Sequence, residues 1–134
     1  MHARLSTREQ RYLARARVCR VASADRSGAT HVAPLCHAFD VSSQTVYVWT
    51  KGRTARNLRE RARGAVECDD YFEDWDRLRG LVAHVRAQTV RSGRELSRAR
   101  QLLKRKFKQY RQYADEDIEW VIGLRIVGAK SWGI

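Results

Sequence analysis

The sequence lacks two features that define large classes of protein: long apolar runs and paired cysteines. No apolar run approaches the ~20 residues that are needed to span a bilayer, and residues 1–17 have no apolar core of a secretory signal. The three cysteines, Cys19, Cys36 and Cys68, are odd in number and far apart, so they predict neither a disulfide framework nor a paired zinc site. We therefore expect a cytoplasmic protein in a reducing compartment, with no membrane partner.

Acidic residues are scarce relative to basic ones. The 134 residues contain 27 Lys and Arg against 15 Asp and Glu, a formal net charge of +12. This excess favours anionic partners such as nucleic acid, a phosphorylated cofactor or an acidic surface. The length suits a single domain over residues 1–134, and no repeat, low-complexity tract or linker divides it.

The spacing of apolar residues predicts three helices and six strands. The helices are expected at 6–17, 54–64 and 94–111, and the strands at 18–24, 30–39, 46–49, 65–71, 81–88 and 118–127. Short turns join most strand neighbours, so we expect a mainly β protein whose antiparallel sheet closes into a barrel. Pro34, the only proline, cannot donate to a β-ladder and predicts a bulge or an edge-like interruption in the second strand.

Residues 46–58 form the most informative segment, which predicts a strand, a basic loop and the start of a helix. Residues 46–49 alternate as a strand does, and Thr54 is a suitable N-cap for the apolar positions that follow. A helix N-terminus presents unpaired backbone N–H groups and a positive dipole end. With Lys51 and Arg53 beside it, this arrangement suits a phosphate. A basic loop that is merely solvated is the alternative.

Three other groups of residues have simpler explanations. Cys36 and His37 lack the further ligands of a zinc site, so we expect a buried Cys on one strand face and a polar His on the other. His84 is expected to be structural. Residues 69–76 cluster carboxylates with aromatics, but they lack the glycine and spacing of a calcium loop. No metal site and no catalytic residue is predicted.

The helix at 94–111 is strongly basic. Its cations could displace counterions from nucleic acid phosphates. However, it has no spacing typical of a helix-turn-helix, a zinc finger or an aromatic RNA-binding motif. Because its apolar residues recur at helical spacing, we favour an amphipathic helix that covers the barrel with its charged side in water.

Several segments together match a known family in order and spacing: 21–25 with Gly28, 31–40, 46–49, 51–58, 70–78, 106–110 and 131–133. The chain resembles the pyridoxamine 5'-phosphate oxidase-like flavin-binding split barrels. It is most similar to a short branch often linked to the deazaflavin coenzyme F-420. The most specific segment is 70–78, which is close to the DHYxEDWxRL run of that branch.

The resemblance implies a split β-barrel homodimer that holds FMN or coenzyme F-420 in a groove at the dimer interface. It also implies hydride transfer between this cofactor and a small molecule, with the chemistry supplied by the cofactor. The positions that it assigns to the cofactor are Val32, Ala33, Pro34, Leu35 and His37 along the ring system, Trp49 and Thr50 beside the ring and ribityl chain, Lys51, Arg53, Thr54 and Arg56 at the phosphate, and Trp75, Arg79 and Trp132 completing the pocket from this chain or its partner.

The chain departs from the family in two places. It lacks the Arg-x-His motif of the oxidases proper, so oxidation of pyridoxamine phosphate is not expected. Residues 61–64 also replace the usual Asn-x-Pro. The large aromatics Tyr47, Trp49, Trp75 and Trp132 favour a dimer interface, because few helices are available to bury them. Two alternatives stay open: a basic nucleic-acid-binding module, and a protein that binds the cofactor without turnover.

Overall fold

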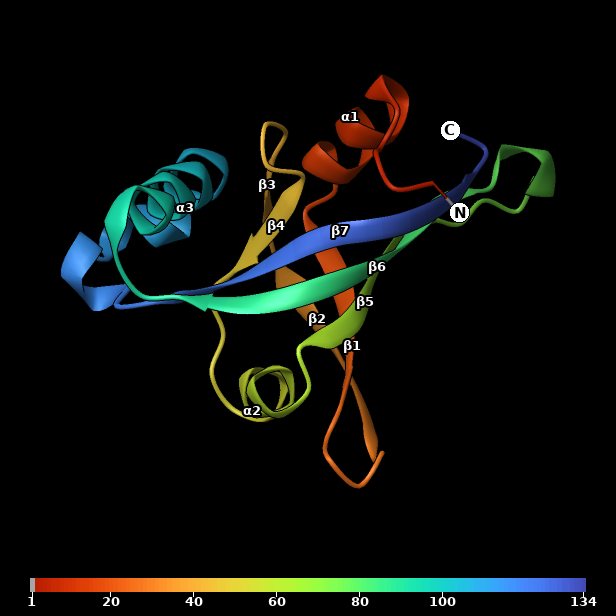
Figure 1. Cartoon of the computed structure of the whole chain (residues 1–134). Coiled ribbons are helices and arrows are strands. Elements are labelled where there is room, and N and C mark those ends of the chain that lie inside the picture. The colour runs from red at the N-terminus through yellow and green to blue at the C-terminus, as the bar shows by residue number, and fades with distance from the viewer. Residues whose placement is uncertain (1) are drawn as a thin grey trace.

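A single seven-stranded sheet organises the chain (Figure 1), a computed structural model that describes residues 2–134. The strand order is β2-β1-β5-β6-β7-β4-β3, and every neighbouring pair is antiparallel. The strands are β1 (Val18–Ala24), β2 (Thr30–Cys36), β3 (Ala38–Asp40), β4 (Thr45–Val48), β5 (Arg63–Asp70), β6 (Arg79–Val90) and β7 (Val121–Trp132). The helices are α1 (Thr7–Arg15), α2 (Arg53–Glu60) and α3 (Gly93–Lys106), with short 3-10 turns at Trp75–Arg77, Lys108–Gln112 and Asp115–Asp117.

The two edge strands of the sheet are consecutive in the chain. Only His37 separates β2, which pairs with β1, from β3, which pairs with β4. The two edge strands of the half-barrel are therefore joined directly by the backbone at His37. The single strand expected at 30–39 is wrong in this respect, because the chain changes partners at His37. The edge position expected from Pro34 is confirmed, since β2 has a neighbour on one side only.

Alternating side chains of the strands fill the barrel. On β6, Leu81, Ala83 and Val85 are buried while the residues between them are not, as the two faces of a pleated strand require. The helices cover the openings: α1 and α3 lie on one side of the sheet and α2 on the other (Figure 1). Among the described residues, no helix is both long enough and apolar enough to cross a bilayer.

Several expected boundaries are corrected. The N-cap of α2 is Gly52, not Thr54, and the helix ends at Glu60 because Gly64 already belongs to β5. Helix α3 ends at Lys106 and a 3-10 turn replaces its last expected turn. The last strand begins at Val121 and continues through the expected tail to Trp132.

The expected facing of Cys36 and His37 is reversed: Cys36 is exposed and His37 is fully buried. The reason is the change of partners described above, which turns the imidazole inward. Its Nε2 lies 2.8 Å from the backbone oxygen of Leu13 in α1. Tyr47 is also buried, in the chain's own core, so it is not available to an interface.

Gly64 is required where β5 begins to pair with its neighbour β1. A Cβ at this position would lie 2.5 Å from the backbone oxygen of Ala22 and 3.3 Å from Leu58 of α2. Because the first neighbour is backbone, we expect Gly64→Ala to lower the free energy of unfolding by about 1–3 kcal/mol. Urea denaturation measures this free energy directly. An unchanged midpoint would contradict the close contact of Gly64 with Ala22.

Candidate functional site

The basic loop before α2 presents open hydrogen-bond donors. Gly52 has a φ of 86°, and no side chain caps the helix that follows. The first intrahelical bond runs from the N–H of Arg56 to the oxygen of Gly52, at 3.0 Å. The N–H groups of residues 53–55 therefore have no acceptor within the helix. The first turn contains no acidic residue, so nothing local offsets the positive end of the helix dipole.

Three cationic side chains surround these donors. Lys51, Arg53 and Arg56 are exposed, and none of them forms an ion pair within residues 2–134. A Cβ added to Gly52 would meet no atom within 4 Å, so the space beside the loop is open. Backbone N–H groups, a helix dipole and unpaired cations are the donor set that binds phosphate in proteins. The residues present therefore fit a phosphorylated ligand.

Helix α2 is held rigidly from its opposite face. Thr54, Ala55 and Leu58 are buried, and the buried side chain of Asn57 donates to Ser23 Oγ of β1 at 3.1 Å. The structure thus places Thr54 inward, although its backbone N–H belongs to the open first turn. This anchoring fixes which face of α2 carries Arg53 and Arg56.

Trp49 and Thr50 connect β4 to the basic loop and are half-buried. The Trp49 ring packs edge-on against Tyr110 and Tyr113, with centroid distances of 5.7 Å and 5.0 Å. Burial raises the pKa of Tyr110 to about 12, so this phenol stays neutral. These three aromatic rings pack together and hold the residue that precedes the basic loop in place.

Two adjoining grooves run along the outer face of β2. One has a volume of about 410 Å³ and is lined by residues that include Val32, His31 and His84, and the other, of about 480 Å³, also includes Val32. Val32 is an apolar residue of β2 that is 62% exposed and lines both grooves. Neither groove is lined by a residue of the basic loop.

The remaining positions on β2 face different ways. Pro34 is exposed like Val32, whereas Ala33 and Leu35 point to the other face and are half-buried. His37 is buried and bonded to Leu13, so in this structure it positions α1 and does not face a ligand. Val32 and Pro34 are the two assigned ring positions that share the outer face.

Trp75, Arg79 and Trp132 lie at the opposite end of the sheet from the basic loop. Arg79 begins β6, and its Nε lies 3.0 Å from Asp70 Oδ2, while the Trp132 ring covers Gly80. The basic loop instead follows Val48, which pairs with Ile122 opposite Thr89. Ten residues of strand separate Arg79 from Thr89, a span of roughly 33 Å. One chain therefore does not bring these two sets together.

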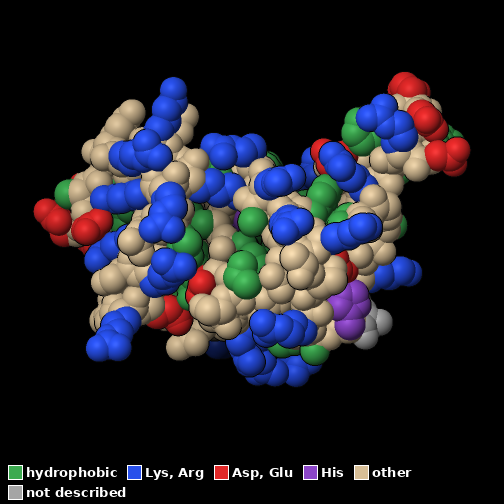
Figure 2. All heavy atoms as spheres, turned by 90° about the horizontal axis from the view of Figure 1, so that it is seen from above, with side chains coloured by type: hydrophobic (Ala, Val, Ile, Leu, Met, Phe, Trp, Pro, Cys, Tyr) green, Lys and Arg blue, Asp and Glu red, His purple; other side chains and the backbone are tan. Residues whose placement is uncertain are grey.

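Residues 71–78 form an acidic arm that projects from the body. Figure 2 shows it at the upper right, with acidic and hydrophobic side chains exposed. Trp75 is 71% exposed and Tyr71 is 62% exposed, and they are linked by a hydrogen bond from Trp75 Nε1 to Tyr71 Oη of 3.2 Å. We call this segment the acidic arm below.

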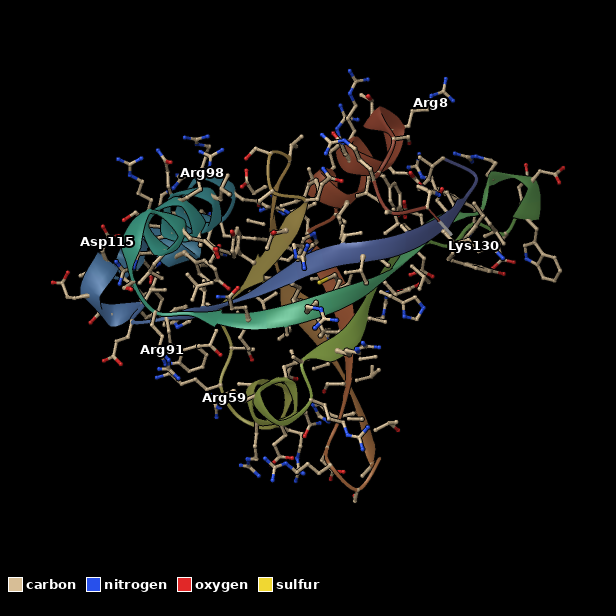
Figure 3. The ribbon with its side chains drawn as sticks, viewed as in Figure 1. Arg8, Arg59, Arg91, Arg98, Asp115 and Lys130 are labelled. Carbon is tan, nitrogen blue, oxygen red and sulfur yellow. The ribbon has the colours of Figure 1, made fainter. Side chains whose placement is uncertain are left out.

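Helix α3 confirms the amphipathic interpretation of the basic helix. Leu96, Ala99 and Leu103 are buried, whereas Arg98 points outward (Figure 3). Lys104 Nζ lies 2.7 Å from Asp115 Oδ1, so part of the positive charge is paired. The sheet lies between this basic face and α2.

His31 and His84 were not predicted as site residues, yet both line the groove on β2. They come from different strands, β2 and β6. His84 lies in register with Ala65, Ala22 and Val32 on the outer face of the sheet, whereas His31 pairs with the buried Ser23. The alternation of buried and exposed positions in residues 81–88 already predicts that the His84 side chain points away from the core. Within residues 2–134, no group of three or more His, Cys, Asp or Glu side chains could hold a metal ion.

Solved structures share this fold. A conserved hypothetical protein from Mycobacterium tuberculosis is 19% identical with a TM-score of 0.78, and the match covers 97% of this chain and 86% of that one. The heme storage protein HutZ from Vibrio cholerae is 14% identical with a TM-score of 0.72, over 95% and 94% of the two chains. A FAD-binding protein from Mesorhizobium loti is 23% identical with a TM-score of 0.71, over 98% and 97%.

These identities are low, so the three structures establish the split-barrel fold and no more. No curated protein sequence matches the chain. The family model described as pyridoxamine 5'-phosphate oxidase matches residues 7–126, which is most of the chain. Together with the seven-stranded antiparallel sheet, this match shows that the chain belongs to the pyridoxamine 5'-phosphate oxidase-like family of split barrels.

Proposed function

We propose that this protein is an oxidoreductase that binds FMN or the deazaflavin coenzyme F-420, with the cofactor phosphate on the basic loop. The observation that carries the proposal is the open donor set at the start of α2, where Lys51, Arg53 and Arg56 have no carboxylate partner among residues 2–134. When bound, such a cofactor supplies the hydride chemistry.

The residues of this chain would bind the cofactor and orient it. The first turn of α2 and its cations hold the phosphate, and the Asn57–Ser23 contact keeps that turn in place. The exposed apolar surface of Val32 offers a flat support for a ring system and excludes water from one side of it. No acid or base beside this surface is needed, because the hydride donor or acceptor is the ring itself.

We further propose a homodimer in which the acidic arm of one copy approaches the basic loop of the other. Arg79 is separated from Thr89, at the end of the sheet near the loop, by roughly 33 Å of strand. Trp75 and Arg79 would therefore complete the site of a second copy. The arm is acidic and aromatic on a chain of net charge +12, and this charge complementarity favours such a contact.

Light scattering should give twice the chain mass of 15.6 kDa at micromolar concentration. Because exposed Trp residues are frequent interface anchors, Trp75→Ala should weaken dimerisation by about 2 kcal/mol, roughly 30-fold. Val41→Ala, an exposed apolar residue on the β3–β4 turn, serves as the control and should change nothing. A monomer that binds the cofactor fully would contradict a shared site.

The function is tested by titrating the purified protein with FMN, coenzyme F-420 and hemin, followed by anaerobic reduction of the complex. Saturable binding of either flavin-type cofactor, with its reduction and reoxidation by a small acceptor, supports the proposal. A cofactor that binds but never turns over indicates a storage or sensing protein. Binding of duplex DNA with a steep salt dependence, and of neither cofactor, would favour the nucleic-acid-binding alternative.

A heme-binding protein is the second candidate. The similarity to HutZ motivates it, and the groove on β2 is lined by His31 and His84, either of which could serve as an axial ligand. A Soret band that is lost in a His31→Ala or His84→Ala variant would favour heme. A Soret band unchanged in both variants would count against this groove.

A further inference from the structure

A second cavity lies on the other side of the molecule from the basic loop. It has a volume of about 510 Å³ and lies between α1 and the ends of β5 and β6. This size suits a small organic ligand. Arg8, labelled in Figure 3, extends from α1 on the side where the chain ends and the acidic arm projects.

Arginines dominate the wall of this cavity. Arg8, Arg11 and Arg15 follow one another at helical spacing along one face of α1, and Arg17 and Arg79 continue the wall. Like charges three and four residues apart destabilise a helix. The only acidic residue of α1 is Glu9, which is buried and accepts from its own N-cap backbone and from His2. The helix therefore carries an uncompensated positive face.

The carboxylates near the cavity are already engaged. Asp69 Oδ1 lies 2.9 Å from Arg20, which is outside the cavity wall. Asp70 Oδ2 accepts from both Tyr12 Oη, at 3.1 Å, and Arg79 Nε, at 3.0 Å.

Within residues 2–134, Arg8, Arg11, Arg15 and Arg17 have no carboxylate within 4.0 Å. Arg17 donates only to the backbone oxygen of Lys106. Four guanidinium groups thus line a cavity whose two aspartates, Asp69 and Asp70, are paired with other arginines, Arg20 and Arg79.

We propose that this cavity binds a small molecule with at least two carboxylate or phosphate groups, at a site separate from the basic loop. Guanidinium groups bind both kinds of anion through paired N–H donors. Their spacing along two turns of α1 matches a ligand with several charges better than a single inorganic ion. Tyr12, Ala16 and Val18 provide an apolar floor for the body of such a molecule.

Isothermal titration with citrate and with pyrophosphate tests this site and distinguishes the two anion chemistries. We expect saturable binding of at least one probe, with a dissociation constant that rises at least tenfold in the double variant Arg11→Ala/Arg15→Ala. The matched control is Arg94→Ala/Arg105→Ala on α3, which removes the same charge from exposed helix positions. Neither arginine forms an ion pair within residues 2–134. The control should change the constant less than twofold.

Equal losses in the two double variants would show general charge attraction and overturn the proposal, as would the absence of saturable binding of either probe. The cofactor titration separates this inference from the proposed function. Arg11→Ala/Arg15→Ala should leave FMN and coenzyme F-420 binding unchanged, whereas a loss of cofactor binding in that variant would contradict a separate site.

Discussion

Arg53→Ala is expected to weaken binding of the phosphorylated cofactor by about one to two orders of magnitude. A charge-assisted hydrogen bond contributes roughly 1.5–3 kcal/mol, and each 1.4 kcal/mol is a factor of ten in the dissociation constant. Arg53 is the first residue of α2 and stands beside the open N–H groups of its first turn. Fluorescence titration of the cofactor gives the two dissociation constants directly.

The matched control for this variant is Arg59→Ala. Arg59 is exposed on the same helix but belongs to its last turn, where its guanidinium lies 5.8 Å from the Trp120 ring centroid. The two variants lose the same charge, so a general electrostatic effect would weaken binding in both. We expect an unchanged constant for Arg59→Ala. Because residue 53 is exposed, thermal unfolding should be the same for the variant and the parent.

Acidification from pH 7 to pH 5 is expected to lower the free energy of unfolding by about 2 kcal/mol through His37 alone. Burial, with a smaller contribution from the charge of Lys106, lowers the pKa of His37 to about 4, against 6.5 for a free histidine. Between these two values the unfolded chain binds the proton and the folded chain does not. Stability is therefore complete above pH 6.5 and decreases as the pH falls toward 4.

Urea denaturation at both pH values tests this, with His37→Gln and His84→Gln compared. The first variant should lose the pH dependence, whereas the second, at an exposed position, should keep it. Glu9 does not interfere: burial raises its pKa, but the nearby Ser131 hydroxyl and the hydrogen bonds with Ser6 and His2 outweigh this and lower it to about 2. Its contribution is lost as the pH falls from 4.5 to about 2, below both pH values of the comparison. A slope that persists in His37→Gln would assign the dependence to another group.

Much of the fold follows from local sequence patterns. The capping box at Ser6 and the turn at Asp25–Gly28 both form as expected, because each depends on residues that are close in the chain. The alternation of residues 81–88 likewise gives a strand with one buried face. These features need no knowledge of distant contacts.

The predictions are wrong where contacts between residues far apart in the chain determine the local structure. Residues 30–39 have one continuous strand pattern, and only the pairing of β2 with β1 and β3 with β4 shows that the chain bends at His37. The same bend buries His37 and exposes Cys36. Thr54 has the chemistry of an N-cap, but burial of its side chain against the barrel moves the helix start to Arg53 and the cap to Gly52.

The candidate site shows the same division. The basic loop is one local segment, and the sequence predicts its phosphate chemistry from Lys51, Gly52 and Arg53 alone. The groove on β2 and the arginine cavity are built from several strands or from a helix and a sheet edge. His31 and His84 are far apart in the sequence, and no pattern along the chain shows that they share a groove.

The most direct test of the phosphate site compares cofactors with and without the phosphate. Dissociation constants are measured for FMN and riboflavin, and for coenzyme F-420 and its phosphate-free chromophore, with the parent chain and with Arg53→Ala. We predict that the parent binds the phosphorylated form of at least one pair more tightly by about one to two orders of magnitude, and that Arg53→Ala removes most of this preference. Equal binding of both forms by the parent, or an equal loss for both forms in Arg53→Ala, would contradict a phosphate held by the basic loop.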